Sequence, residues 1–307
     1  MVTIHLQCNS FAQDKTIFNI HLEDTLNYWG NIILNGSEDF IKYNANEHFS
    51  DILLGSINKE NSIDYPFDSL KTAFHYNSPD KKFRIINWQL PKNDGTFEYF
   101  CIIQSFNKNE KKFDVYQLKD KSAAITVPEN AILGPEMWFG ALYYKVIYQK
   151  YKDKKYYTLL AWDGNNSISC KKIIDVLTFN DIGKPTFGAP IFKYENKICK
   201  RIVFEYKANS AFTLRYDKQY SKIREKKRKV GGQYVKKGKN KKWMIIYDKL
   251  IPEEYTLKGF YQFYIPDKSI TNAFYFKKGK WIQVNDIDVR SNKHHFIQKL
   301  SFYLKKK

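Results

Sequence analysis

The sequence predicts a mainly β, α+β fold in which a helical N-terminal part precedes a large antiparallel sheet assembly. Before about residue 80 the apolar residues recur at helical spacing, and after it they recur at a spacing of two. The 307 residues include 23 Tyr, 23 Phe and 6 Trp, and aromatic side chains favour strands. Clusters of Asn, Asp, Gly and Lys separate the short apolar runs, as turns between antiparallel strands require.

The first predicted element is a helix from Ser37 to about Asn58. Its apolar residues fall on one face, Ser37 suits the N-cap, and Glu38 and Asp39 occupy the first turn. A second short helix or a turn is expected over residues 66–74, before Ser78-Pro79-Asp80 interrupts the chain. Residues 13–80 are therefore expected to form a helical N-terminal part, and residues 81–307 a β-rich body.

From Phe83 onward the period of two predicts about a dozen short strands. Asn93-Asp94-Gly95 is a strong hairpin signal between two of them. The predicted strands are Arg84–Leu90, Phe97–Phe106, Phe113–Leu118, Ala141–Gln149, Tyr156–Trp162, Ile173–Phe179, Ile202–Tyr206, Phe212–Tyr216, Trp243–Tyr247, Phe260–Ile265, Ala273–Phe276 and Trp281–Val284. A sandwich, a barrel or a propeller-like meander would protect the edges of so many antiparallel strands, and the sequence leaves the three open.

One weak internal echo bears on the propeller alternative. Residues 242–248 resemble residues 280–286, at a separation of 38 residues. Propeller blades repeat at about 40 to 45 residues. Two copies are too few to establish a propeller.

The positive charge of the chain is concentrated in one insertion. The sequence has 51 Lys and Arg against 32 Asp and Glu, a net charge of +19. Residues 218–242 hold 12 of the basic residues and one acid, Glu225, so this basic insertion alone carries +11. Blocks of like charge stay solvated, so the insertion is either an exposed loop between two strands or a contact for a polyanion. The residues assigned to that contact are Lys226, Lys227, Arg228, Lys229, Lys236, Lys237, Lys239, Lys241 and Lys242.

Residues 1–12 resemble the end of a secretory signal peptide. Ser10 and Ala12 occupy the third and first positions before a cut at Gln13, where signal peptidase accepts small residues. A positive region and a full apolar core would have to lie upstream. We therefore expect a periplasmic or secreted protein, cut after Ala12. No other segment approaches the roughly 20 apolar residues that cross a bilayer, so no transmembrane span is expected.

Cysteine usage excludes a disulfide-stapled scaffold. After that cut Cys101, Cys170 and Cys199 remain, which allow at most one disulfide. Cys170 with Cys199 is one pairing in an exported chain, and buried thiols are the alternative that we favour. No C-x-x-C pair indicates zinc or redox chemistry.

Catalytic motifs are scarce in this sequence. It has no Gly-x-Ser-x-Gly elbow, no His-Glu-x-x-His helix, no Gly-x-x-x-x-Gly-Lys-Ser/Thr loop and no dinucleotide fingerprint. His294 and His295 are adjacent, and neighbours on a strand point to opposite faces, so we expect no metal site there. No cofactor is expected.

Three further groups of residues have a structural and a functional interpretation. Residues 163–166, Asp-Gly-Asn-Asn, offer oxygen ligands for calcium but suit a hairpin turn better. Asp286 and Asp288 would share a strand face if the strand continues that far, for acid–base work or for the solubility of an edge strand. The tryptophans would form a sugar-stacking platform or, as we favour, pack in the core: Trp88, Trp138, Trp162, Trp243 and Trp281.

Several segments within about residues 40–290 share one further property: residues 65–70, 78–80, 83–85, Trp88, and residues 143–147, 157–165, 184–192, 201–206 and 276–281. Together they resemble an uncharacterised family of exported Bacteroidota proteins. The resemblance implies export from a Gram-negative cell and brings no activity or catalytic residue with it. The short leader and the long basic insertion depart from the family pattern.

We therefore expect an exported, non-enzymatic binding or cell-envelope support protein. Its basic insertion would contact an anionic lipid surface or an acidic glycan; no specific nucleic acid is expected, and the oligomeric state stays open. The alternative is a secreted glycan or ester hydrolase that uses carboxylates which the sequence does not single out. A cleft with two carboxylates about 5 to 9.5 Å apart between aromatic walls would favour a glycosidase.

Overall fold

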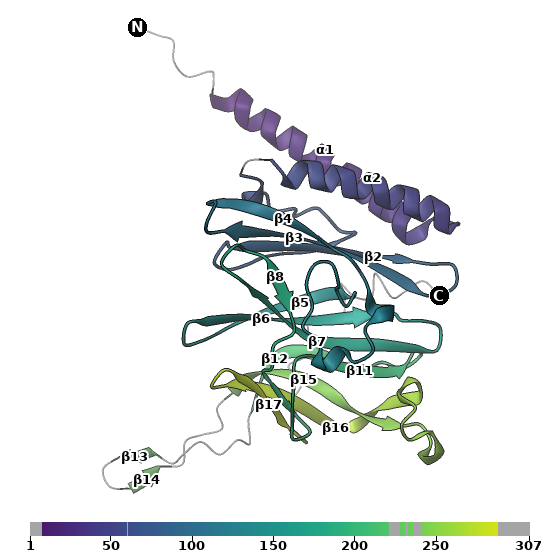
Figure 1. Cartoon of the computed structure of the whole chain (residues 1–307), viewed down its shortest axis with the longest axis vertical. Coiled ribbons are helices and arrows are strands. Elements are labelled where there is room, and N and C mark those ends of the chain that lie inside the picture. Colours follow the sequence, from purple (N-terminus) through teal and green to yellow (C-terminus); the bar gives the residue numbers. More distant parts are fainter. Residues whose placement is uncertain (1–7, 60, 221–227, 231–232, 236–240, 288–307) are drawn as a thin grey trace.

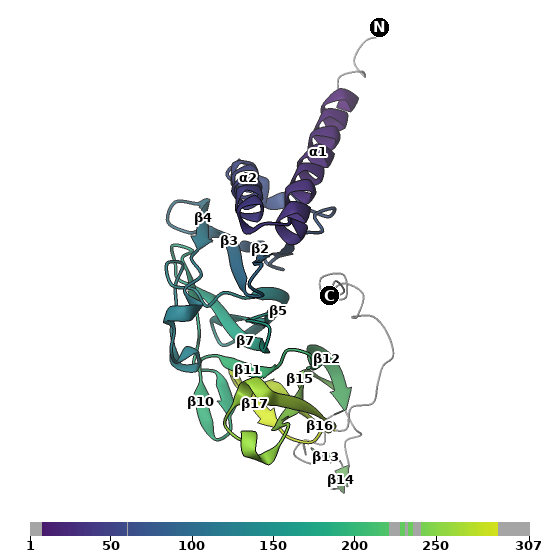
Figure 2. The same cartoon turned by 90° about the vertical axis from the view of Figure 1, so that its right-hand side faces the viewer.

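The computed structural model describes residues 8–59, 61–220, 228–230, 233–235 and 241–287, and side chains within 21–59, 61–219 and 241–287. Two helices and three large sheets are stacked along the long axis of the molecule (Figures 1 and 2). Separate groups of buried apolar residues join each layer to the next. The prediction of an α+β fold is confirmed, and the stacked open sheets match the sandwich alternative.

The helical layer consists of α1 (Cys8–Asn35) and α2 (Asp39–Ile57). The helix predicted over residues 37–58 is confirmed as α2, but its N-cap residue is Glu38 rather than Ser37. Leu26 of α1 and Phe49 of α2 are buried against Ile86 and neighbours in the first sheet. Helix α1 was not predicted, and it includes the predicted cleavage position after Ala12. None of the described helices is long and apolar enough to cross a membrane.

The first sheet is an antiparallel meander that lies beneath the helices. Its strands are β1 (Phe74–Asn77), β2 (Phe83–Pro91), β3 (Phe97–Asn107) and β4 (Lys112–Leu118), in that order. The predicted hairpin at residues 93–95 is confirmed, because Pro91 pairs with Phe97 and Gly95 has a φ of 83°. Residues 66–73 form a turn and bends rather than a helix, and Phe74 already begins β1.

The second sheet is the central layer and is covered on both faces. Its order is β11-β7-β6-β5, with β8 paired to β7. The strands are β5 (Leu142–Tyr151), β6 (Lys154–Asp163), β7 (Ser169–Phe179), β8 (Pro185–Phe187) and β11 (Ile202–Lys207). Leu159 faces the first sheet and Leu160 faces the third, which explains why β6 is buried at consecutive positions.

The third sheet has the order β10-β9-β17-β16-β15-β12. Its strands are β9 (Phe192–Tyr194), β10 (Lys197–Cys199), β12 (Leu214–Tyr220), β15 (Lys241–Pro252), β16 (Tyr264–Lys277) and β17 (Lys280–Val284). Strand β17 pairs with β9 in parallel, an exception to the predicted antiparallel arrangement. The two strands predicted over residues 260–265 and 273–276 are wrong as separate elements, because β16 is one strand that a short 3₁₀ turn precedes.

The weak internal repeat of residues 242–248 and 280–286 does not correspond to two propeller blades. Its two copies are β15 and β17, which lie in the same sheet on either side of β16. Four of the five candidate tryptophans pack in the core, as favoured: Trp88, Trp138, Trp162 and Trp281 are at most 7% exposed. Trp243 is 53% exposed, so it alone departs from the core-packing prediction.

Candidate functional site

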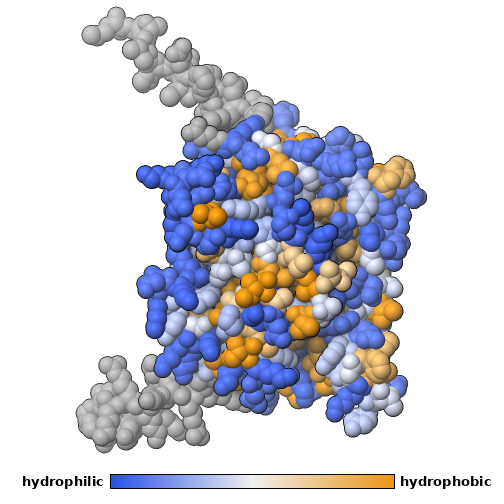
Figure 3. Space-filling view, viewed as in Figure 1, coloured by the Kyte–Doolittle hydropathy of each residue, from blue (hydrophilic) through white to orange (hydrophobic). Residues whose placement is uncertain are grey.

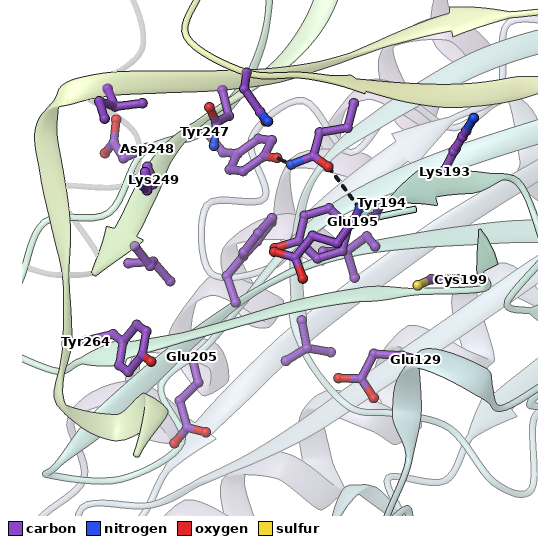
Figure 4. A pocket seen from close by; sticks show the side chains of 18 of the residues that line it. Glu129, Lys193, Tyr194, Glu195, Cys199, Glu205, Tyr247, Asp248, Lys249 and Tyr264 are labelled. Carbon is purple, nitrogen blue, oxygen red and sulfur yellow. Dashed lines mark hydrogen bonds between the residues drawn. The ribbon is translucent and has the colours of Figure 1, made fainter. Parts of the chain in front are cut away.

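A cavity of about 910 Å³ lies between β11 of the second sheet and the face of the third sheet. Its walls come from β9, β10, β15, β16 and β17, and from two short 3₁₀ turns, η3 (Pro128–Asn130) and η5 (Tyr261–Phe263). These segments are far apart in the sequence, and only the stacking of the second and third sheets brings them together. Figure 4 shows the side chains that line this intersheet cavity.

Aromatic rings form much of the cavity wall. Tyr194, Phe204 and Tyr247 make an inner group, in which the Tyr194 and Tyr247 rings lie 6.2 and 4.8 Å from the Phe204 ring. Tyr261 and Tyr264 make an outer group, with ring centres 5.0 Å apart. Burial raises the pKa of Tyr194 and of Tyr247, so both hydroxyls stay protonated at neutral pH. The wall therefore combines flat apolar faces with hydroxyl groups.

A side-chain amide is fixed between two elements of the wall. The Gln283 amide on β17 donates from Nε2 to the Tyr247 hydroxyl at 2.9 Å, and its Oε1 accepts from the backbone N–H of Glu195 at 2.9 Å (Figure 4). Glu195 lies in the turn between β9 and β10, so Gln283 joins that turn to β15. The arrangement holds polar groups at the cavity surface in defined orientations.

The cavity is acidic although the chain is strongly basic. Its lining includes five carboxylates and two ammonium groups, a balance of −3 in a chain of net charge +19. No described side chain forms an ion pair with any of the five. The acids are Glu129, Glu195, Glu205, Asp248 and Asp286, and the bases are Lys193 and Lys249.

Two of these carboxylates are held by neighbouring strands. The Ser169 hydroxyl donates to Glu205 Oε1 at 2.6 Å, and the backbone N–H of Thr213 donates to Asp248 Oδ2 at 2.7 Å. Each carboxylate keeps a second oxygen for other partners, since an ionised carboxylate accepts at both oxygens. They therefore combine a fixed position with remaining capacity to bind a donor.

Glu129 is positioned by a buried ion pair. Its backbone carbonyl accepts from the N–H groups of Lys200 at 2.8 Å and Arg201 at 3.3 Å. The Arg201 guanidinium donates to the Pro128 carbonyl and, through Nε, to Asp175 Oδ2 at 2.7 Å. Both partners of this ion pair are at most 2% exposed. The pair thus fastens the η3 turn, and Glu129 with it, to the edge of the second sheet.

Cys199 at the cavity wall does not have the environment of a nucleophile. Burial, and then the nearby Glu129 carboxylate, raise the pKa of its thiol. Catalytic cysteines need a lowered pKa, because the thiolate is the reactive form. Cys170 and Cys199 are not joined in a disulfide, but the favoured alternative of buried thiols holds only for Cys101, because Cys170 and Cys199 are partly exposed.

The strands that flank the basic insertion are β12 and β15 of the third sheet. Strands β12 and β15 pair up to Tyr220 opposite Lys241, so the basic insertion joins two neighbouring strands, as predicted for an exposed loop. Along β15, Lys241 is about 20 Å from Tyr247 at the cavity, at 3.4 Å per residue. Lys241, at the described end of the insertion, is therefore separated from the intersheet cavity along β15.

Only some of the assigned basic residues belong to the described chain. Arg228 and Lys229 lie on β13 (Arg228–Val230), which pairs with β14 (Gln233–Val235) as a separate ribbon. Lys242 lies on β15 with its Nζ 6.0 Å from the centre of the Tyr275 ring. Outside the described residues lie Lys226, Lys227, Lys236, Lys237 and Lys239.

The other candidates from the sequence have structural roles or fall outside the description. Asp163 ends β6 and accepts hydrogen bonds from the Tyr99 hydroxyl at 3.1 Å and the Asn165 N–H at 2.7 Å, which bears out the hairpin turn. Asp286 lines the cavity but lies beyond the end of β17, so the strand does not continue as a face shared with Asp288 would require. Asp288, His294 and His295 lie outside the described residues. Within the described part, no three His, Cys, Asp or Glu side chains gather as metal ligands.

Most residues that line the cavity could not be singled out from the sequence, and Asp286 and Cys199 are the exceptions. Tyr194 and Glu195 sit at a hairpin between two three-residue strands, and Gln283 is an ordinary polar position in a predicted strand. No local spacing connects them, so the one available signal was the abundance of tyrosine. Comparison of the chain with protein-family models, with curated proteins and with solved structures finds no match.

Proposed function

We propose that this chain is an exported, non-enzymatic binding protein that holds a carbohydrate in the intersheet cavity. The observation that carries the proposal is the combination of tyrosine rings and fixed polar groups around one cavity of about 910 Å³. Small-molecule sites usually have volumes of about 300–1,000 Å³ and combine such surfaces. The signal-peptide-like pattern of residues 1–12 and the family resemblance support export.

The chemistry of a sugar ring fits this lining. A pyranose has apolar C–H faces that stack on aromatic rings, and a rim of hydroxyls that donate and accept hydrogen bonds. Tyr194, Tyr261 and Tyr264 offer partly exposed rings, whereas the Tyr247 ring is buried between Phe204 and Phe274. The carboxylates of Glu129 and Glu205 would accept from hydroxyls. Because these groups sit on strands and tight turns, a ligand would find them already in place, which lowers the entropic cost of binding.

The charge of the cavity restricts the type of sugar. With five carboxylates against two lysines, an acidic glycan would meet like charges in a confined site. A neutral or amino-bearing glycan avoids that repulsion. The acidic glycan or anionic lipid predicted from the sequence is therefore assigned to the basic insertion, as a second binding function.

A secreted glycan hydrolase is the alternative, because the cavity gathers carboxylates beside aromatic rings. Glu129 and Glu195 come from separate turns and Glu205 from β11, so these three are the candidates for acid–base work. An ester hydrolase that uses Cys199 is disfavoured by the raised pKa of that thiol.

Isothermal titration calorimetry against neutral, amino-bearing and acidic oligosaccharides tests the binding proposal. We expect a neutral or amino-bearing glycan to bind, and Gln283→Ala to weaken binding about tenfold or more, because the amide and its support of Glu195 are lost. Gln117→Ala is the matched control, since Gln117 is exposed on β4 in the first sheet. Equal affinities of the wild type and Gln283→Ala would show that the glycan binds elsewhere.

Product analysis on the same mixtures distinguishes binding from hydrolysis. A binding protein leaves the oligosaccharide intact over the incubation. Release of shorter sugars by the wild type, and its loss in Glu129→Gln or Glu205→Gln with binding retained, would replace the binding proposal by the hydrolase. If no oligosaccharide binds or is cleaved, the carbohydrate assignment fails.

A further inference from the structure

The connection between β15 and β16 places an aromatic surface next to the cavity. It spans residues 253–263 and contains two 3₁₀ turns, η4 (Tyr255–Leu257) and η5. Tyr255 is 84% exposed, Phe260 55% and Tyr261 58%. Figure 3 shows pale and orange residues among blue ones at the lower right, the end of the molecule where this connection lies. Three large rings on one short exposed connection are more than the isolated apolar residues expected on a surface.

The connection is held in place by hydrogen bonds at both ends. The Glu253 N–H donates to the Phe263 carbonyl at 3.1 Å, and the Lys207 ammonium donates to the Glu253 carboxylate at 2.7 and 2.8 Å. The Gly259 N–H donates to the Tyr264 hydroxyl at 3.1 Å, with a φ of +96° that glycine adopts readily. A ligand that binds to these rings would therefore need to order little of the connection.

Tyr261 belongs to both surfaces. It lines the intersheet cavity and stands 5.0 Å from the Tyr264 ring, yet more than half of its side chain is exposed. Phe260 and Tyr255 lie on the same short connection and are exposed as well. A ligand that filled the cavity and extended past Tyr261 would therefore have two further exposed rings within the same connection.

We propose that the ligand is a glycan chain, with one part in the cavity and the following units stacked on an external platform of Tyr255, Phe260 and Tyr261. This inference rests on the proposed carbohydrate function. Continuity with a polar cavity favours a sugar chain over a lipid surface, and so does the local charge. Glu253 and Glu254 accompany the single Lys258 on this connection, whereas contacts with anionic membranes need an excess of Lys and Arg.

Affinity measured against chain length tests the platform. The probes are cello-oligosaccharides and chitosan oligosaccharides as di-, tetra- and hexasaccharides, titrated by calorimetry into the full chain. We expect the wild type to bind one hexasaccharide about tenfold or more tightly than its disaccharide, because each stacked unit adds a contact. In the double variant Tyr255→Ala/Phe260→Ala the hexasaccharide should bind no more than about threefold better than the disaccharide.

Phe40→Ala is the matched control, because Phe40 is 72% exposed on α2, away from the third sheet. It should keep the full dependence on chain length. A dependence that survives in the double variant would overturn the platform and leave the cavity proposal standing. If the wild type binds the disaccharide and hexasaccharide equally, the platform is also overturned. If it binds none of these sugars, the proposed function itself fails.

A final experiment measures binding of the protein to vesicles of a neutral and of an anionic phospholipid. The wild type and the double variant should bind them equally, because the platform is assigned to sugar. Vesicle binding that depends on Tyr255 and Phe260 would overturn the proposal and make the connection a lipid contact.

Discussion

Replacement of Asp175 by Asn should weaken both the fold and the cavity. Asp175 Oδ2 accepts from Arg201 Nε at 2.7 Å, and Oδ1 accepts from the Val176 N–H at 2.7 Å. The substitution leaves the Arg201 guanidinium buried without its counter-charge, packed 5.6 Å from the centre of the Phe139 ring. Arg201 Nη2 already lacks a hydrogen-bond partner in the described part of the chain, so little remains to compensate the charge.

The expected loss follows from the burial of the pair. Arg201 is 0% and Asp175 2% exposed, and removal of one partner from such a pair costs about 3–5 kcal/mol. Typical domains unfold with about 5–15 kcal/mol, so the variant should remain folded at 25 °C with a clearly lowered denaturation midpoint. Because Arg201 also donates to the Pro128 carbonyl, the turn that holds Glu129 should loosen and glycan affinity should fall.

Urea denaturation followed by tryptophan fluorescence measures the stability loss. Asp181→Asn is the control, since the Lys108–Asp181 pair spans 2.8 Å on the surface and should contribute little. The double variant Asp175→Leu/Arg201→Met should recover much of the loss, because apolar residues often replace a buried ion pair at little cost. The reasoning is refuted if Asp175→Asn and Asp181→Asn shift the midpoint equally.

Two further predictions concern charge. Lys172 is 8% exposed with Nζ 4.6 Å from the Tyr144 ring, and burial lowers its pKa to about 8. The folded protein therefore releases this proton at a lower pH than the unfolded chain does, so the stability of the wild type should rise with pH. Relative to Lys172→Met, its free energy of unfolding should increase by about 2 kcal/mol between pH 7 and 10. A difference between the two proteins that does not change with pH would contradict this. Retention of the protein on heparin or anionic vesicles should fall steeply as the salt concentration rises. This dependence on salt should weaken when six residues of the basic insertion are changed to Gln, because each charge contributes at most about 1 kcal/mol to binding. Equal slopes would contradict the polyanion contact. The six are Lys226, Lys227, Arg228, Lys229, Lys236 and Lys237, and exposed control lysines are Lys121, Lys150, Lys154, Lys268, Lys277 and Lys280.

Local patterns were sufficient where local chemistry determines the structure. The turn at residues 93–95 joins β2 to β3 because its residues favour that hairpin, and α2 forms where apolar residues repeat at helical spacing. The missed elements depend on distant partners. Helix α1 is held by the packing of Leu26 and Ile33 in the helical layer. Strand β9 has three residues and exists as a parallel neighbour of β17, about 90 residues later.

The candidate site was harder to predict for the same reason. The sequence predicted a binding function for the basic insertion because its charges lie close together in the sequence. The cavity instead takes Glu129 from a turn, Tyr194 from β9, Tyr247 from β15 and Gln283 from β17. Their functional relation arises only when the second and third sheets stack, so neither composition nor spacing expresses it.

Trp243 and Trp281 show how far an identical local pattern can diverge. Each follows a lysine and begins an apolar run, and both contact the Tyr216 ring, at 5.0 Å and 6.3 Å. Trp281 is fully buried, because it packs against side chains of the second sheet, where its Nε1 donates to Thr158 Oγ1 at 2.9 Å. Trp243 lies near the start of β15, where no described strand covers it to the same extent, and is 53% exposed. A strand pattern thus fixes which side chains share a face, but the neighbouring layer decides which of them are buried and which remain available for binding.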